Sequence, residues 1–117
     1  MRRLVVKLTA GSDAPERCLQ GLTVASVALA AGAEVSLWLT GESVHLAVPG
    51  GELEIPESPP ASVLLAAVVA AGSVQVCTQC AARRGLVQDD LTPGITIAGA
   101  AAFVEQALGD GVQALVY

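Results

Sequence analysis

The sequence predicts an α/β protein, a three-layer α/β/α sandwich built around a five-strand, mainly parallel sheet. Strand-like and helix-like segments alternate along the whole chain, and this alternation is typical of a parallel sheet covered on both faces. The strand-like segments are short apolar runs bounded by turn-forming residues. We predict strands over residues 3–9, 34–40, 73–77, 95–99 and 112–117.

The first strand, RLVVKLT, stops at the turn-forming AGSD, and we predict a helix over residues 14–31. Asp13 followed three positions later by Glu16 forms a capping-box pattern at the start of this helix, and Gly32 marks its end. EVSLWLT alternates enough to form the second strand, and Gly41 then introduces a short turn or helical piece, ESVHLA.

The middle of the chain is predicted to be an exposed loop followed by a buried helix. PGGELEIPESPP, residues 49–60, holds four of the six prolines and several acidic residues, as expected for a long exposed loop. ASVLLAAVVAA, residues 61–71, is apolar on nearly every side. We therefore predict a buried helix that ends at Gly72, with the strand SVQVC directly after it.

The last third of the chain repeats the alternation. Residues 78–84 are predicted as a short helix ending at Gly85, and LVQDDLTPG as a polar connection. ITIAG forms the fourth strand, AAAFVEQALGDG a helix and VQALVY the final strand.

Length and composition favour one domain that associates with other copies. A chain of 117 residues suits a single core, so we expect one domain over residues 1–117. The composition is 53% hydrophobic, but only 3% is aromatic and 15% charged. A domain this small cannot bury all of that apolar surface, and we therefore expect a homo-oligomer.

Charge and motif content exclude several classes of function. A net charge of −5 offers no attraction for nucleic acid. The apolar run at the N-terminus is broken at Lys7, too early for a signal peptide, and no run reaches the roughly 18–20 residues that span a bilayer. We expect a cytoplasmic protein that does not contact membranes. Neither a GxGxxG nor a Walker-type loop occurs, and we expect no cofactor.

The segment CTQCAARRG, residues 77–85, carries the candidate chemistry. Cys77 is predicted at the carboxyl end of a parallel strand, where functional groups gather in this topology. The helix after it would favour the thiolate through free N–H groups and the helix dipole, and Arg83 and Arg84 add positive charge nearby. The alternative interpretation is a small buried cysteine, which is common for unpaired thiols.

Three other residues are candidates for the site. Cys80 lies three positions after Cys77, so the two sulfurs can approach closely enough for a disulfide, and Cys80 could resolve an oxidised or sulfur-loaded Cys77. His45 could face the same edge of the sheet and act as an acid or base, or be a surface residue. Cys18, in the first helix, is expected in the core. A structural zinc site needs four ligands, and the chain offers one cysteine pair, so we expect no metal. The alternative is a zinc ion shared between subunits.

The stretch VCTQCAARRGL resembles the active-site region of the DsrE/DsrF-like family: a strand, Cys, five residues, then Arg-Arg-Gly. The opening strand with TAGSDAPERC, the segment AAGAEVSLWLTGESV and the closing GITIAGAAAFVEQAL extend the resemblance over most of the chain. Members of the family are small three-layer α/β proteins that assemble into trimers or hexamers, and the sulfur-transfer members carry a persulfide on one cysteine. That cysteine corresponds to Cys77, whereas Cys80 stands where those carriers have a small apolar residue.

The resemblance implies a sulfur-relay protein, a sulfurtransferase or sulfur carrier. Cys77 would accept sulfane sulfur from a donor protein and pass it to an acceptor thiol, with Cys80 as the resolving thiol and Arg83, Arg84 and His45 as electrostatic support. The alternative is a noncatalytic oligomeric binding or redox-responsive module of the same family, in which the cysteines are structural.

Overall fold

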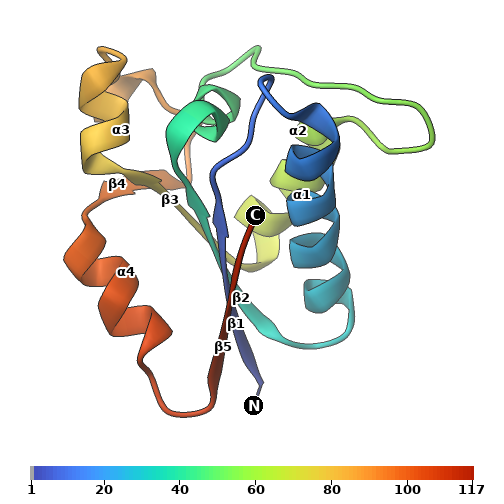
Figure 1. Ribbon diagram of the computed structural model, residues 1–117, viewed down its shortest axis with the longest axis vertical. Coiled ribbons are helices and arrows are strands. Elements are labelled where there is room, and N and C mark those ends of the chain that lie inside the picture. Colours follow the sequence, from blue (N-terminus) through green and yellow to red (C-terminus); the bar gives the residue numbers. More distant parts are fainter. Residues whose placement is uncertain (1) are drawn as a thin grey trace.

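The computed structural model describes residues 2–117 and contains one five-stranded sheet in that range (Figure 1). The strand order is β4-β3-β2-β1-β5, and every neighbouring pair is parallel. The predicted three-layer α/β architecture is confirmed. The strands are β1 (Arg3–Leu8), β2 (Glu34–Leu39), β3 (Ser73–Cys77), β4 (Ile95–Ala98) and β5 (Val112–Val116).

The helices form two unequal layers. Figure 1 shows α1 (Pro15–Ala30) and α2 (Ala61–Ala71) on one side of the sheet and α4 (Ala100–Ala107) on the other. Connections between parallel strands are right-handed, and the chain steps outward from β1 to β4 before returning to β5 beside β1. The return runs in the opposite direction along the sheet, which is why α4 lies on the opposite face.

Three short elements lie at the carboxyl edge of the sheet, where the strands end. They are the 3-10 helix η1 (Gly41–Ala47) after β2, the helix α3 (Thr78–Arg83) after β3, and the 3-10 helix η2 (Gln88–Asp90) before β4. In Figure 1 the segment between η1 and α2 projects from this edge, and most of its residues are exposed or half-buried, as predicted.

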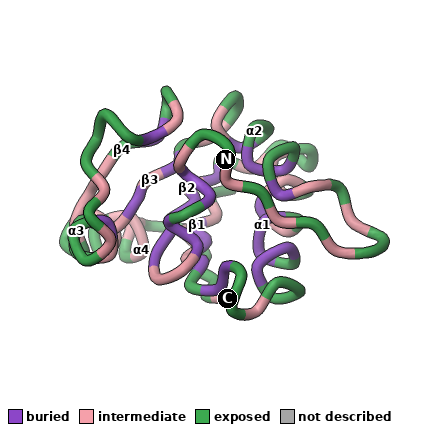
Figure 2. The backbone as a smooth tube through the Cα atoms, turned by 90° about the horizontal axis from the view of Figure 1, so that it is seen from above, coloured by how far each residue is buried: buried purple, intermediate pink, exposed green. Residues whose placement is uncertain are grey.

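The main core lies between the sheet and α1 with α2. Leu8, Leu22 and Leu37 have no exposed surface, and burying a leucine side chain stabilises the fold by about 1.5–3 kcal/mol. Gly21 permits close contact between α1 and the sheet, because a Cβ there would lie 2.8 Å from Leu8 Cδ1. In Figure 2 the buried residues concentrate in the central strands and on the sheet-facing side of α1.

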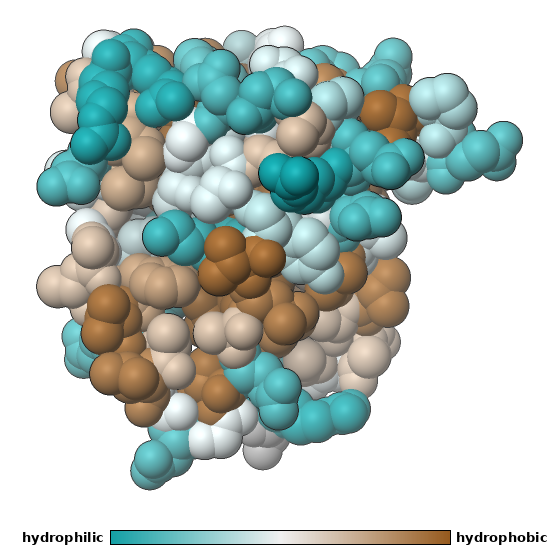
Figure 3. Space-filling model, in the orientation of Figure 1, coloured by the Kyte–Doolittle hydropathy of each residue, from teal (hydrophilic) through white to brown (hydrophobic). Residues whose placement is uncertain are grey.

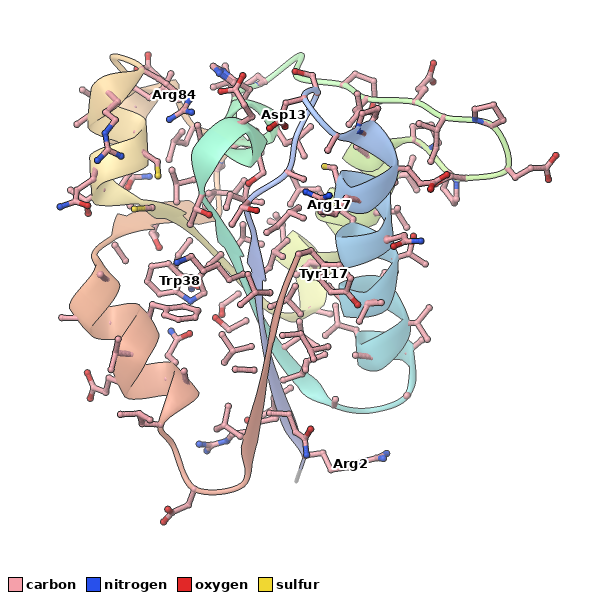
Figure 4. All side chains as sticks on the ribbon, viewed as in Figure 1. Arg2, Asp13, Arg17, Trp38, Arg84 and Tyr117 are labelled. Atoms are coloured by element: carbon pink, nitrogen blue, oxygen red, sulfur yellow. The ribbon has the colours of Figure 1, made fainter. Side chains whose placement is uncertain are left out.

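The opposite face has a thinner layer that combines aromatic and polar contacts. Trp38 of β2 is 1% exposed and lies between the sheet and α4 (Figure 4), where its ring meets Phe103 edge to face at 5.6 Å. Its indole N–H donates to Gln106 Oε1 at 2.8 Å, and the Ser36 hydroxyl lies 2.7 Å from the same oxygen. The Ser36 hydroxyl also lies 2.8 Å from Gln75 Oε1 of β3; with its single hydrogen it donates to one of the two glutamine oxygens at a time.

Two local predictions are wrong. No side chain caps α1: its N-cap is Ala14, and Asp13 instead accepts a hydrogen bond from the Gly11 N–H at 2.8 Å. Helix α2 is buried on one side only. Leu64 and Val68 face the core, whereas Val63 is 56% exposed, because no further layer covers the outer side of this helix.

The Gln106 contact is testable by its effect on stability. Changing Gln106→Ala leaves the buried indole N–H of Trp38 without its acceptor, and the free energy of unfolding should fall by about 1–3 kcal/mol. Urea unfolding followed by circular dichroism measures this loss, and the fluorescence of Trp38, the chain's one tryptophan, should change in the folded state. Glu105→Ala, at an exposed position of the same helix, is the matched control. Equal stability of the two variants would contradict the role given to Gln106.

Candidate functional site

The carboxyl edge of the sheet brings together residues from β1, β2 and β3. Parallel strands end on the same side, so the connections after them meet there. Cys77 is the last residue of β3 and the N-cap of α3, and it is half-buried. The position predicted for it at the end of a strand is therefore the one it occupies.

Several groups act on the Cys77 sulfur. Partial burial raises the pKa of the thiol, but the N–H and thiol of Cys80, the N–H of Gln79 and the charge of Lys7 together outweigh burial, so the pKa lies below its ordinary value. A lowered pKa increases the fraction of thiolate at neutral pH, and the thiolate is the reactive form.

Cys80 lies beside Cys77, and η1 holds it in place. Its Sγ accepts a hydrogen bond from the Gly41 N–H at 3.2 Å, and its side chain packs against the edge of the main core. Gly41 has φ +55°, and a Cβ there would lie 2.8 Å from the Thr9 carbonyl oxygen, so only glycine fits this approach without strain. All three cysteines are free thiols.

Arg84 joins α3 to η1 rather than pointing at the sulfur (Figure 4). Its guanidinium donates from Nε and NH2 to Glu42 Oε2 at 3.0 and 2.9 Å, and from NH1 to the Cys80 carbonyl oxygen at 3.1 Å. His45 Nε2 lies 3.5 Å from Glu42 Oε2. These contacts position the end of α3, while Arg83 is exposed.

Lys7 is the residue that the sequence did not single out. It lies in β1 and is half-buried, and its Nζ is 5.2 Å from the centre of the Phe103 ring. In the sequence Lys7 only interrupts an apolar strand. The one available signal was its alternation with Val6 and Leu8, which places it on the other face of the sheet, but its proximity to Cys77 depends on the strand order.

Cys18 is separate from this site. It has no exposed surface and lies in the main core, as predicted. Burial, with a smaller effect of the Asp13 carboxylate, raises the pKa of the Cys18 thiol to about 11. At neutral pH this thiol is protonated and enclosed, in contrast to Cys77.

Two cavities of the molecule are lined by other residues than the cysteines. A cavity of about 360 Å³ opens at the opposite, amino edge of the sheet, beside Arg3, Ser36 and Gln106. A smaller one of about 170 Å³ includes Glu42 and His45 in its lining. We place the candidate site at Cys77, because this half-buried thiol lies at the carboxyl edge of the sheet and has a lowered pKa.

Neither a metal centre nor a membrane segment emerges from the part of the chain that the structure describes. Within residues 2–117 no three His, Cys, Asp or Glu side chains are grouped so that they could hold a metal ion. No helix in that range is both long and apolar enough to cross a bilayer.

The raised pKa of Cys18 predicts a loss of stability at alkaline pH. The thiol has a pKa of about 11 when folded and about 9 when unfolded. The folded state therefore binds the proton more tightly, and the stabilisation is complete below about pH 9 and is lost as the pH rises toward about 11. Urea unfolding at about pH 8 and pH 10 should show a fall of about 1 kcal/mol that is missing in Cys18→Ala. An identical fall in both proteins would contradict the raised pKa.

Comparison with known proteins identifies the family. The chain resembles the ychN protein from E. coli, with 18% identity, complete coverage of both chains and a TM-score of 0.85. It also resembles MTH1491 from Methanobacterium thermoautotrophicum, a protein of unknown function, with 12% identity, complete coverage of both chains and a TM-score of 0.78. No curated protein matches the chain. The model of the DsrE/DsrF-like family matches residues 2–116, and the chain therefore belongs to the DsrE/DsrF-like family.

Proposed function

We propose that this protein is a cytoplasmic sulfur carrier in which Cys77 accepts sulfane sulfur from a donor protein and passes it to an acceptor thiol. Membership of the DsrE/DsrF-like family supports a general role in sulfur relay. The observation that carries the specific proposal is the lowered pKa of Cys77, a half-buried thiol at the carboxyl edge of the sheet.

The transfer needs no oxidant, because sulfur moves at the oxidation level that it already has. The Cys77 thiolate attacks the outer sulfur of a donor persulfide, the donor S–S bond breaks, and the donor departs as a thiolate that takes up a proton. An acceptor thiolate then attacks the outer sulfur on Cys77, which leaves as a thiolate. A thiol of low pKa is the better leaving group, so the environment of Cys77 favours this second step.

Cys80 provides a competing reaction. Its thiolate can attack the inner sulfur, that of Cys77 itself, so that hydrosulfide leaves and a Cys77–Cys80 disulfide forms. The outer sulfur is reduced to hydrosulfide while the two cysteines are oxidised, and a dithiol reductant restores them. The effect of the Cys80 thiol, which helps to lower the pKa of the Cys77 thiol, supports this role for Cys80.

Mass spectrometry of the intact protein tests the carrier. After treatment with a persulfide donor, the reduced chain should gain one sulfur atom that a small thiol removes. Cys77→Ser should abolish the gain, and Cys18→Ser, a buried position outside the site, should leave it unchanged. In Cys80→Ser the loaded form should last several times longer and release less hydrosulfide.

Two results would contradict the carrier. If the Cys77→Ser variant still gained sulfur, Cys77 would not be the residue that accepts it. No gain in the reduced, unaltered chain would favour the alternative function, a noncatalytic or redox-responsive binding module.

We also propose that the carrier is a homo-oligomer, a trimer or hexamer. Large apolar side chains are exposed on α4 and β5, and the space-filling view shows brown surface over this part of the molecule (Figure 3). Val104 is 49% exposed, Leu108 79% and Val116 65%. Exposed apolar surface of this kind favours association with another chain.

Light scattering tests this surface. Changing Leu108→Glu introduces a charge into the apolar patch, and the assembly should dissociate toward monomers because burying the carboxylate is unfavourable. Val27→Glu is the matched control, since Val27 is also exposed, at 61%, but lies on α1 at the other face of the sheet. A monomeric unaltered chain, or equal dissociation of both variants, would contradict an interface at α4.

A further inference from the structure

We infer that Lys7 is a positioning residue for the sulfur chemistry: its ammonium group, held over Phe103, supplies the positive charge that stabilises the anionic forms of Cys77. These forms are the thiolate and the persulfide. The catalytic relevance of Lys7 rests on the proposed carrier function, whereas its effect on the Cys77 thiolate does not.

The register of the sheet places Lys7 and Cys77 on the same face. Lys7 pairs with Trp38, and Trp38 pairs with Gln75. Cys77 follows Gln75 by two positions in β3, and residues two apart in a strand face the same side. With strands about 4.8 Å apart and a rise of about 3.3 Å per residue, the two Cα atoms are about 12 Å apart. This separation exceeds the length of a lysine side chain, so the ammonium acts on the sulfur through its field and not by direct contact.

Helix α4 determines where the ammonium lies. Lys7 Nζ is 5.2 Å from the centre of the Phe103 ring, and that ring is in turn held edge to face against Trp38. A cation over an aromatic ring is attracted by the ring's electron-rich face, which keeps the charged end at the sheet surface. The Trp38–Gln106 hydrogen bond fixes the helix, so a chain of contacts runs from α4 to the lysine.

The charge of Lys7 is not neutralised by a carboxylate in the described range. The ion pairs there join Arg3 to Glu34, and Arg84 and His45 to Glu42. A partly buried cation without an acidic partner is costly unless an anion approaches it. The field of Lys7, after the larger effects of Cys80 and Gln79, helps to lower the pKa of the Cys77 thiol.

The other charged and titratable groups around Cys77 are accounted for. Helix α3 contributes Cys80, Arg83 and Arg84, η1 contributes Glu42 and His45, and α4 carries the exposed Glu105. Of the charged side chains, Lys7 is the one whose field shifts the pKa of Cys77. Arginines in the motif therefore position α3, while a lysine from a distant strand supplies the charge.

The rate at which iodoacetamide alkylates Cys77, measured against pH, tests this inference. All proteins carry Cys80→Ser, so that one thiol of the pair titrates and the donor at position 80 is kept. Lys7→Met should raise the apparent pKa of Cys77 by about half a unit and lower its rate near pH 7 about threefold. The rate on the alkaline plateau should not fall, and Lys7→Arg should restore the lower pKa.

Acetylation of Lys7 separates the effect of the lost charge from any misfolding of the Lys7→Met variant. Lys7 is the chain's one lysine, so acetylation neutralises it in the native sequence, and acetylated Lys7→Arg controls for the α-amino group. Acetylation should raise the pKa of Cys77 in the first protein only. The inference would be overturned if neutralising Lys7 left the pKa of Cys77 unchanged. It would also be overturned if only the alkylation rate on the alkaline plateau fell.

The two proposals fail separately. If neutralising Lys7 raises the pKa but Cys77 gains no sulfur, the electrostatic role holds and the carrier function is wrong. If Cys77 carries sulfur but its pKa does not change when Lys7 is neutralised, the carrier function is supported and the inference about Lys7 is wrong.

Discussion

The parallel pairing of β3 between β2 and β4 is the constraint on which the site depends. Because all neighbouring strands run the same way, the ends of β1, β2 and β3 meet at one edge, and residues far apart in the chain become neighbours. Gly41 after β2 reaches Cys80 after β3, and Arg84 reaches back to Glu42. An antiparallel pairing of β2 with β3 would place their carboxyl ends at opposite edges and remove these contacts.

The two faces of the sheet differ in the kind of side chains that cover them. The face covered by α1 and α2 is dry and closely packed, and its one cysteine, Cys18, is kept protonated by burial. The face covered by α4 holds a tryptophan, two glutamines and a serine whose polar groups lie within hydrogen-bond distance of one another, and a lysine whose ammonium lies over the Phe103 ring. A charged side chain is tolerated there because the layer is thin and aromatic rather than fully apolar. Cys77 lies on this second face.

Much of this arrangement was predictable from local patterns. The order of strands and helices, the position of Cys77 at a strand end and the burial of Cys18 follow from runs of apolar residues and from glycines that end them. The capping-box pattern at Asp13 failed because the side chain satisfies the Gly11 N–H in the preceding turn. The burial of α2 was overestimated because an apolar composition does not reveal whether a second layer covers a helix.

By itself, the sequence determined the fold class, the family resemblance and the identity of the candidate thiols, since these depend on local periodicity and on a short motif. Only the tertiary structure decided which charge acts on Cys77. Arg83 and Arg84 follow it by six and seven positions in the motif, but Arg84 pairs with Glu42 and Arg83 is exposed. Lys7 precedes it by seventy residues, yet sheet register brings both to one face, because electrostatic interaction depends on distance in space and on burial rather than on separation along the chain.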